Sequence, residues 1–195
     1  MDLHEMRKKL KKDLDKARYE HTKGVMYTAA SLAMANGYSI EKAMIAGLLH
    51  DCAKCLPTEE KLALCERHHI LVSTIEKENP GLLHAKAGMA LAEEKYGITD
   101  PEILHAIKVH TTGEPNMNIL DKIIYIADYI EPGRDQAPHL EVIRQIAFED
   151  LNQCMAEILY HTLHYLNNRK GSIDPATNIT FEFYEHYGKE QPWKH

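Results

Sequence analysis

The sequence predicts an all-α protein, a compact bundle of helices in a single domain. Apolar residues recur at helical spacing along almost all of its 195 residues, whereas strand-like alternation is scarce. Helix start and stop signals cut the chain into segments of helical length, and no internal repeat, low-complexity stretch or linker lies between them. We therefore expect one domain over residues 1–195.

Four helices are expected in the N-terminal part of the chain. An apolar stripe predicts the first over about residues 3–17, and a second over about 20–36 ends before Gly37, a helix-stop signal. Ser39 can cap a third helix, which runs into a His-Asp pair. We expect Thr58 to cap the fourth, because acidic residues follow it in the first turn.

Further helices are expected after the Pro80-Gly81 break. One opens at Asp100-Pro101, and the others cover about residues 83–96, 117–130, 139–149 and 151–168. The tail is ambiguous, because residues 179–183 alternate like a short strand while Asp174-Pro175 is typical of a helix start. We favour a helix there.

Composition excludes several classes of protein. A net charge of −6 argues against non-specific nucleic-acid binding, and no apolar run approaches the ~18 residues of a membrane span. The charged N-terminus lacks the apolar segment of a secretory signal. The lone Cys52-x-x-Cys55 pair, with Cys65 and Cys154, is expected to supply free buried thiols in a reduced compartment, the cytoplasm.

Two aspartates stand where apolar side chains predict burial. His50-Asp51 directly follows the apolar run 45–49, and Asp128 lies within the run 123–130. An ionised carboxylate there is costly unless a cation or several donors compensate it. A hydrogen-bonded pair would satisfy Asp51, and Lys122 or Arg134 could neutralise Asp128. Two such acids in separate helices, with histidines to match, favour a shared metal.

Three more histidines fall in apolar or helix-end contexts, namely His21, His84 and His110. Taken singly, each is more often a structural residue than a metal ligand. Their order along the chain, together with the two aspartates, raises the odds of a metal site. The other histidines lack a completing acid or a buried context, and we expect structural roles for His68, His69, His105, His139, His161 and His164.

The order His21, His50-Asp51, Asp128 resembles the metal-binding signature of the HD-domain phosphohydrolases, an all-helical superfamily. His84 and His110 resemble the extra ligands of its two-metal members. Five short sequence motifs around these residues are similar to those of the YqeK-type family. They are Arg18-x-x-His21, His50-Asp51-x-Ala53-Lys54, Leu82-Leu83-His84-Ala85, His110-Thr111-Thr112-Gly113 and Ala127-Asp128-x-x-Glu131-Pro132-x-Arg134. The similarity runs from about residue 15 to 170, the expected core of one HD domain.

This resemblance implies a reaction and a cofactor. Members of the family are bacterial proteins that cleave diadenosine tetraphosphate (Ap4A) symmetrically, so we expect two nucleoside diphosphates as products, with ADP or GDP as product-like ligands. Asp51 would bridge a first metal held also by His21, His50 and Asp128 to a second held by His84 and His110. The family implies iron, although such ligands also suit manganese, cobalt or zinc. Two metals ~3.5–4 Å apart would turn a bridging water into the attacking hydroxide.

Substrate contacts are expected from residues beside the ligands. Lys54 and Arg134 are candidates to clamp the phosphates, Lys54 acting with Asp51 in catalysis, and Arg18 is a weaker candidate. Thr111 and Thr112 offer hydroxyl or backbone donors. Surface ion pairing is the alternative for Arg18 and Arg134. Glu131 is expected to orient a ligand rather than bind metal, and the family implies a homodimer.

Three other functions of the predicted metal site stay open at this point. The same ligands would serve a nucleotidase or phosphodiesterase that acts on another nucleotide. A nucleotide-sensing protein could keep the metal and lack turnover, although every proposed ligand is present. A purely structural metal would make the fold depend on it, so that chelation would unfold the protein.

Overall fold

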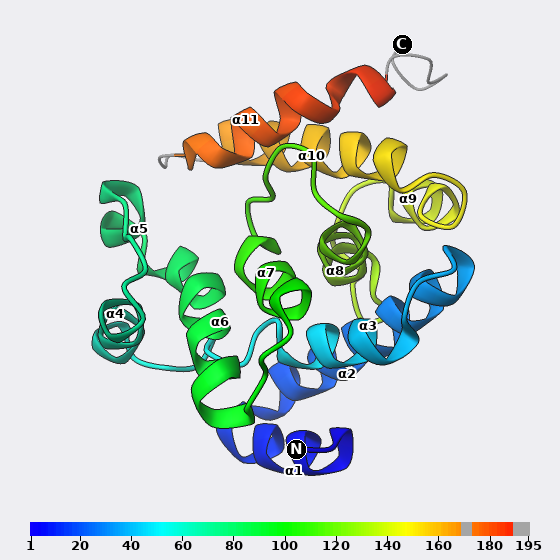
Figure 1. The fold of residues 1–195 in the computed structure, drawn as a ribbon. Helices are drawn as coiled ribbons and strands as arrows, with labels where there is room; N and C mark the ends of the chain where they lie inside the picture. Colours follow the sequence, from blue (N-terminus) through cyan, green and yellow to red (C-terminus); the bar gives the residue numbers. More distant parts are fainter. Residues whose placement is uncertain (169–172, 189–195) are drawn as a thin grey trace.

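Helices make up the computed structural model, which describes residues 1–168 and 173–188 (Figure 1). Within these residues there are eleven α-helices and no strand, as the sequence predicts. They are α1 (Leu3–Asp13), α2 (Lys16–Ala35), α3 (Ile40–Leu49), α4 (Thr58–Arg67), α5 (Thr74–Glu78), α6 (Leu83–Tyr96), α7 (Pro101–Val109), α8 (Ile119–Ile130), α9 (Leu140–Ile146), α10 (Leu151–Asn167) and α11 (Pro175–Tyr184). No described helix is long and apolar enough to cross a membrane.

Two helix starts differ from the prediction. The first break falls at residues 14–15 rather than near 18, because the Asp15 side chain accepts the backbone N–H of Arg18 and so begins α2 there. Thr58 does not cap α4: Pro57 occupies that position without a side-chain hydrogen bond, and Thr58 is the first helical residue. The early start places Arg18 and His21 one turn apart on the same helix.

One short helix was not expected at all. α5 has only five residues, too few for a periodic apolar pattern to reveal it. It is held by a capping box, in which Ser73 and Glu76 each accept the other's backbone N–H. A 3₁₀ turn over Pro80–Leu82 then leads into α6.

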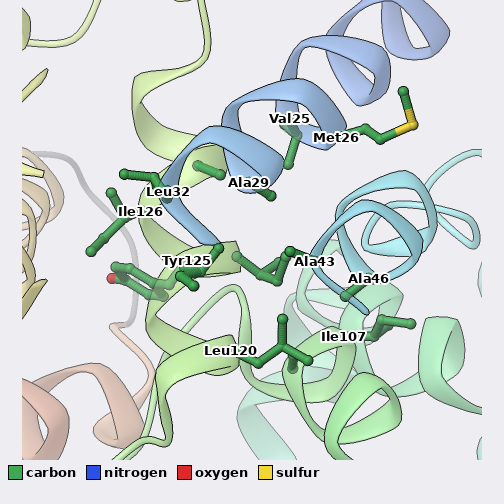
Figure 2. Close-up of a cluster of buried hydrophobic side chains, with 14 of the residues drawn as sticks. Val25, Met26, Ala29, Leu32, Ala43, Ala46, Ile107, Leu120, Tyr125 and Ile126 are labelled. Carbon is green, nitrogen blue, oxygen red and sulfur yellow. The ribbon is translucent and has the colours of Figure 1, made fainter. Parts of the chain in front are cut away.

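α8 lies at the centre of the bundle, in contact with α2, α3, α7, α9 and α10. Apolar side chains from α2, α3, α7 and α8 meet around it (Figure 2). Ile123, Ile124 and Ala127 of α8 are fully enclosed. Because the next residue after this buried stretch is Asp128, the core itself fixes where that carboxylate stands.

A second, smaller core lies beside the first, where α4 packs on α6 (Figure 1). Leu64, Cys65 and Leu83 are among its members. All four cysteines are free thiols, and three of them are buried. Cys55 is exposed, so the expectation of a buried thiol is wrong there: the residue lies in the turn after α3 and reaches no core.

The tail is a helix, as favoured from its start signal. Asp174 caps α11 by accepting the N–H of Ala176. The alternating residues 179–183 lie in the second half of this helix, which packs on α10. Tyr184 is buried and its hydroxyl oxygen accepts the N–H of Met117, which ties the tail to the loop before α8.

Candidate metal centre

Five helices bring the six predicted ligands to one place. His21 lies on α2, His50 and Asp51 directly follow α3, His84 lies in the first turn of α6, His110 directly follows α7, and Asp128 lies in the last turn of α8. Neighbouring imidazole centroids are 5.4 Å apart for His21 and His50, and 5.0 Å for both His50–His110 and His84–His110. The cluster therefore forms at the meeting point of helix ends.

The two carboxylate oxygens of Asp51 face different histidines. Oδ2 lies 3.6 Å from Nε2 of His50 and 4.0 Å from Nε2 of His21. Oδ1 lies 3.1 Å from Nε2 of His84 and 3.7 Å from Nε2 of His110. A carboxylate placed in this way can join two neighbouring cation sites.

Asp128 closes the first side of the cluster. Its Oδ1 lies 3.0 Å from Nε2 of His21 and 3.9 Å from Nε2 of His50. Three groups of donor atoms have the spacing to hold an ion, with all atoms of a group within 4.8 Å of one another: His21, His50 and Asp51; His50, His110 and Asp128; Asp51, His84 and His110.

Backbone carbonyls fix the orientation of three imidazoles. Nδ1 of His50, His84 and His110 lies 2.7, 2.6 and 2.7 Å from the carbonyl oxygen three residues earlier. A carbonyl can only accept, so Nδ1 carries the proton in each ring and donates it. Nε2 is then left with a free lone pair directed at the cluster, which is the form that binds a metal.

Several of these atoms make no hydrogen bond despite their close neighbours. Among the described residues, Nε2 of His21, Nε2 of His50 and Oδ1 of Asp51 are buried without a hydrogen bond of acceptable geometry. Buried polar atoms are nearly always satisfied, and leaving one unpaired is costly. A divalent cation among these nitrogen and oxygen donors would satisfy them, so the residues fit a metal.

Charge in the cluster favours cation binding. Burial raises the pKa of Asp51, but the rings of His50, His110 and His84 outweigh it and hold that pKa well below its usual value. Burial likewise raises the pKa of Asp128, and His21 and His50 bring it far down. Burial lowers the pKa of His50 to about 4, so this ring is neutral near neutral pH. Ionised carboxylates beside a neutral imidazole are the protonation states that a metal requires.

Three cations rest against the cluster. Nη1 of Arg18 lies 2.7 Å from Oδ2 of Asp51, and Nζ of Lys54 lies 3.1 Å from Nε2 of His84. Nη2 of Arg134 lies 2.9 Å from Oδ1 of Asp128, which is the neutralising contact considered from the sequence. Lys122 does not take that role, because its ammonium donates to Asn152.

Of the two threonines expected to contact substrate, only Thr111 lies at the cluster. Oγ1 of Thr111 lies 3.2 Å from Nε2 of both His84 and His110, at the edge of the cluster. The hydroxyl of Thr112 instead donates to the carbonyl of Gly113 within its own loop.

Glu131 stands behind His21 and away from the cluster centre. Its Oε1 lies 3.1 Å from Nδ1 of His21, and its Oε2 accepts the N–H of Gly133 at 2.7 Å. Gly24 makes room for it, since a Cβ on Gly24 would come within 2.3 Å of Oε2. Sequence reasoning missed this role of Gly24. A glycine in the interior of an expected helix was the available signal.

Among the described residues, three cavities reach the cluster. One of about 550 Å³ is lined by His21, Glu20 and Tyr27, among others, and the other two share a wall. Of these two, one of about 420 Å³ is lined by Arg18, His21 and Glu131, among others. The other, of about 170 Å³, reaches His84, His110 and Asp128 and has walls that include Tyr125, Tyr129, Ile158 and Thr162. Arg134 and Ala137 line both, so the loop after α8 stands between them.

The histidines expected to be structural lie elsewhere. His68 contacts Glu93 and Glu94, and His105 contacts Asp121 and Glu114. His139 stacks on His161 with centroids 4.6 Å apart. Within the described parts of the chain, no group with metal-binding spacing includes them, nor His69 or His164.

Comparison with known proteins identifies the family of the chain. The family model of the HD domain matches residues 18–133, which hold all six candidate ligands. A Bacillus subtilis (strain 168) protein named symmetrical bis(5'-nucleosyl)-tetraphosphatase is 38% identical over 174 residues, 89% of this chain and 92% of that protein. A protein of the same name from Halalkalibacterium halodurans is 41% identical over 172 residues, 88% and 91% of the two chains.

A solved structure has the same fold. It is a Clostridium acetobutylicum protein described as a predicted HD superfamily hydrolase involved in NAD metabolism, with a TM-score of 0.90 and 39% identity. The match covers 94% of this chain and 97% of that one. The family model covers more than half of the chain, the relatives are 38–41% identical over most of it, and this chain belongs to the HD domain family.

Proposed function

We propose that this protein hydrolyses Ap4A and related dinucleoside tetraphosphates symmetrically, to two nucleoside diphosphates. The observation that carries the proposal is the shared carboxylate of Asp51, whose two oxygens face two pairs of imidazoles. The chain that presents it is 38–41% identical to proteins named for this reaction, over most of its length. As a member of the HD domain family it is a hydrolase with a divalent metal centre.

The residues divide into two sets around Asp51. His21, His50, Asp51 and Asp128 would hold one ion, and Asp51, His84 and His110 the other. Ions in these places would act as Lewis acids toward a phosphoryl oxygen and lower the pKa of water. We propose iron as the metal, as the family resemblance implies, with manganese, cobalt and zinc as the alternatives that the donor types allow.

Lys54, Arg134 and Arg18 are proposed to bind the phosphate chain. Each now faces an acid or an imidazole of the cluster, at 2.7 to 3.1 Å. Bound cations would neutralise those carboxylates, and the three side chains would then turn to phosphate oxygens, where charge builds up during the transfer. Thr111 adds a hydroxyl beside His84 and His110.

The two cavities that share a wall suit a substrate with two ends. A phosphorus atom near the middle of a dinucleoside tetraphosphate carries a nucleotide on either side, so the substrate must leave the cluster in two directions. We propose that the halves enter the two cavities, with Arg134 between them. Tyr129 and Ile158 give one cavity the flat and apolar contacts that a nucleoside prefers.

A cytoplasmic location, expected from the cysteine usage, and a homodimer, expected from the family resemblance, remain part of the proposal. Four free thiols are consistent with the reducing cytoplasm. A homodimer rests on the family resemblance alone, and light scattering of the purified protein tests it directly.

Product analysis with metal analysis tests the proposed function. The purified protein would be assayed for bound metal and incubated with Ap4A, deoxynucleoside triphosphates, nucleoside monophosphates and cyclic dinucleotides. We expect ADP as the sole product from Ap4A, with one ¹⁸O atom incorporated per turnover in H₂¹⁸O. Fast release of nucleoside from a monophosphate, without ADP from Ap4A, would identify a nucleotidase instead. Tight ADP binding without any turnover would identify a nucleotide sensor.

A further inference from the structure

The loop between α8 and α9, residues 131–139, carries two groups that serve the cluster. Glu131 stands behind His21, and Arg134 contacts Asp128 and borders both cavities that share a wall. Its first turn is held by few bonds of its own: Arg134 N–H donates to the carbonyl of Glu131, and Gly133 N–H to the carboxylate of Glu131. A segment this short and irregular needs an outside anchor to keep a fixed shape.

Arg144 of α9 supplies that anchor. Its Nε donates to the carbonyl of Ile130 at 3.0 Å, and its Nη2 donates to the carbonyls of Glu131 at 3.0 Å and Arg134 at 2.9 Å. One guanidinium therefore fixes the last residue of α8 and both functional positions of the loop.

The contacts depend on the shape of arginine. A guanidinium presents several N–H groups in one rigid plane, whereas a lysine ammonium is a single point with a flexible stem. Among the described residues, Arg144 pairs with no carboxylate, so its charge is met by backbone carbonyls alone. The guanidinium itself lines none of the three cavities.

We propose that Arg144 is a positioning residue for the reaction, which holds Glu131 behind His21 and Arg134 beside the substrate path. It acts only through the loop. The inference rests on the proposed function, because the loop matters through its contact with the proposed ligand His21 and through the phosphate contact of Arg134. A displacement of about 1 Å at such groups can cost on the order of 100-fold in rate.

The test compares Arg144→Ala and Arg144→Lys with wild type, and uses Arg67→Ala as the matched control. Arg67 is an exposed arginine that pairs with Glu94, far from the loop in its contacts. Hydrogen exchange of the metal-free proteins would measure the exchange rates of the backbone amides of Gly133 and Arg134. Metal binding isotherms, kcat and KM would follow, without and with added guanidinium ion.

We expect faster exchange of these two amides in Arg144→Ala and a fall in kcat/KM or metal affinity of about 10–100-fold, the range for residues that orient ligands. With saturating metal the loss should be mainly in KM, because Arg134 binds substrate. Guanidinium should restore part of it, Arg144→Lys should stay impaired, and Arg67→Ala should behave as wild type.

Other outcomes overturn the proposal. Unchanged exchange at the loop, or kcat/KM equal to wild type once the folded fraction is counted, would show that Arg144 is merely structural. Full activity in Arg144→Lys would show that a charge suffices without the planar fork. A wild-type protein that hydrolyses a different nucleotide would refute the proposed function alone, since every Arg144 comparison can be made on that substrate.

Discussion

Asp51 lies between the two halves of the candidate centre. Oδ2 belongs to the side of His21 and His50, and Oδ1 to the side of His84 and His110. An asparagine in its place would offer one oxygen and one NH₂ group, which repels a cation. Besides Asp51, one proposed ion would be held by His84 and His110, and the other by His21, His50 and Asp128. A substitution of His84 should therefore affect the first ion and spare the second.

We predict that Asp51→Asn loses both ions and all hydrolysis, whereas His84→Ala loses one of two ions. The reason is that Asp51 faces both donor sets and His84 only one. Metal content per chain, measured by mass spectrometry beside turnover of Ap4A, checks this. His68→Ala, a substitution at a surface histidine paired with Glu93 and Glu94, should change neither. Two ions retained in Asp51→Asn would contradict a shared carboxylate.

At the scale of elements, Gly24 of α2 packs closely against Glu131 at the end of α8. Gly24 lies on α2 where a Cβ would come within 2.3 Å of Oε2 of Glu131. Alanine in a helix interior is ordinarily better than glycine by about 0.5–1 kcal/mol. Here that gain should be reversed, because the added methyl group pushes on the carboxylate that orients His21.

We predict that Gly24→Ala destabilises the protein by about 1–3 kcal/mol and weakens metal binding. In a Glu131→Ala background the obstacle is gone, and the same substitution should become neutral or stabilising. Urea unfolding and metal titration of the two single variants and the double variant form the test. Additive effects in this cycle would mean that Gly24 and Glu131 do not interact.

A second contact between elements should depend on pH. Glu76 of α5 accepts from the Lys86 ammonium of α6 at 2.8 Å and from the N–H of Ser73. Burial raises the pKa of Glu76, but these two donors outweigh it, so the net pKa lies below the ordinary 4.5. A lowered folded-state pKa means that the stabilisation is present above pH 4.5 and is lost as pH falls through the folded-state value.

Glu76→Gln should therefore lower the free energy of unfolding most near neutral pH. The difference from wild type should shrink in acid, where wild-type Glu76 also becomes neutral. Denaturant unfolding across this range measures it, with Glu59→Gln on the exposed start of α4 as a control. A difference that stays constant with pH would assign the effect to shape rather than charge.

Sequence signals fixed most helices because caps and breakers act locally. Gly97 ends α6 and Asp100-Pro101 begins α7, as predicted, because each of these signals acts on neighbouring residues. The exceptions have local causes too: Asp15 took the cap position earlier than expected, and α5 was too short for a pattern. Contacts such as Gly24 with Glu131 join residues far apart in the chain: a glycine inside a helix is visible in the sequence, but its partner is not.

For the whole molecule, the main question is what the metal contributes to the fold. The helices bury their apolar side chains in two clusters, around α8 and between α4 and α6, and neither needs an ion. The candidate centre places buried nitrogen and oxygen atoms without hydrogen bonds, and ionised carboxylates, beside these cores, which costs stability. The fold should therefore survive without metal, at reduced stability.

Chelation is predicted to abolish hydrolysis while most of the helical circular dichroism remains. The melting temperature should fall, because a metal at 100 times its Kd stabilises by about 2.7 kcal/mol. Readdition of metal should restore both activity and melting temperature. Loss of helicity on chelation would instead indicate a structural metal, as in proteins that fold only around their ion.

At this scale the sequence predicted which residues meet but not how they are held. The order of two acids and four histidines is readable along the chain, because each stands out in its local context. The anchoring by Arg144 is not, since an arginine on a short helix looks like any solvated residue. Its partners are main-chain carbonyls, which carry no mark in the sequence.

The imidazole orientations imply an order of assembly. His50, His84 and His110 are each aimed by a carbonyl three residues away, so their ring positions are set as soon as the adjoining helix end forms. His21 is aimed by Glu131, 110 residues along the chain. We expect nascent or partly unfolded chains to capture an ion first at His84 and His110, with the His21 side completed only when the last turn of α8 docks on α2.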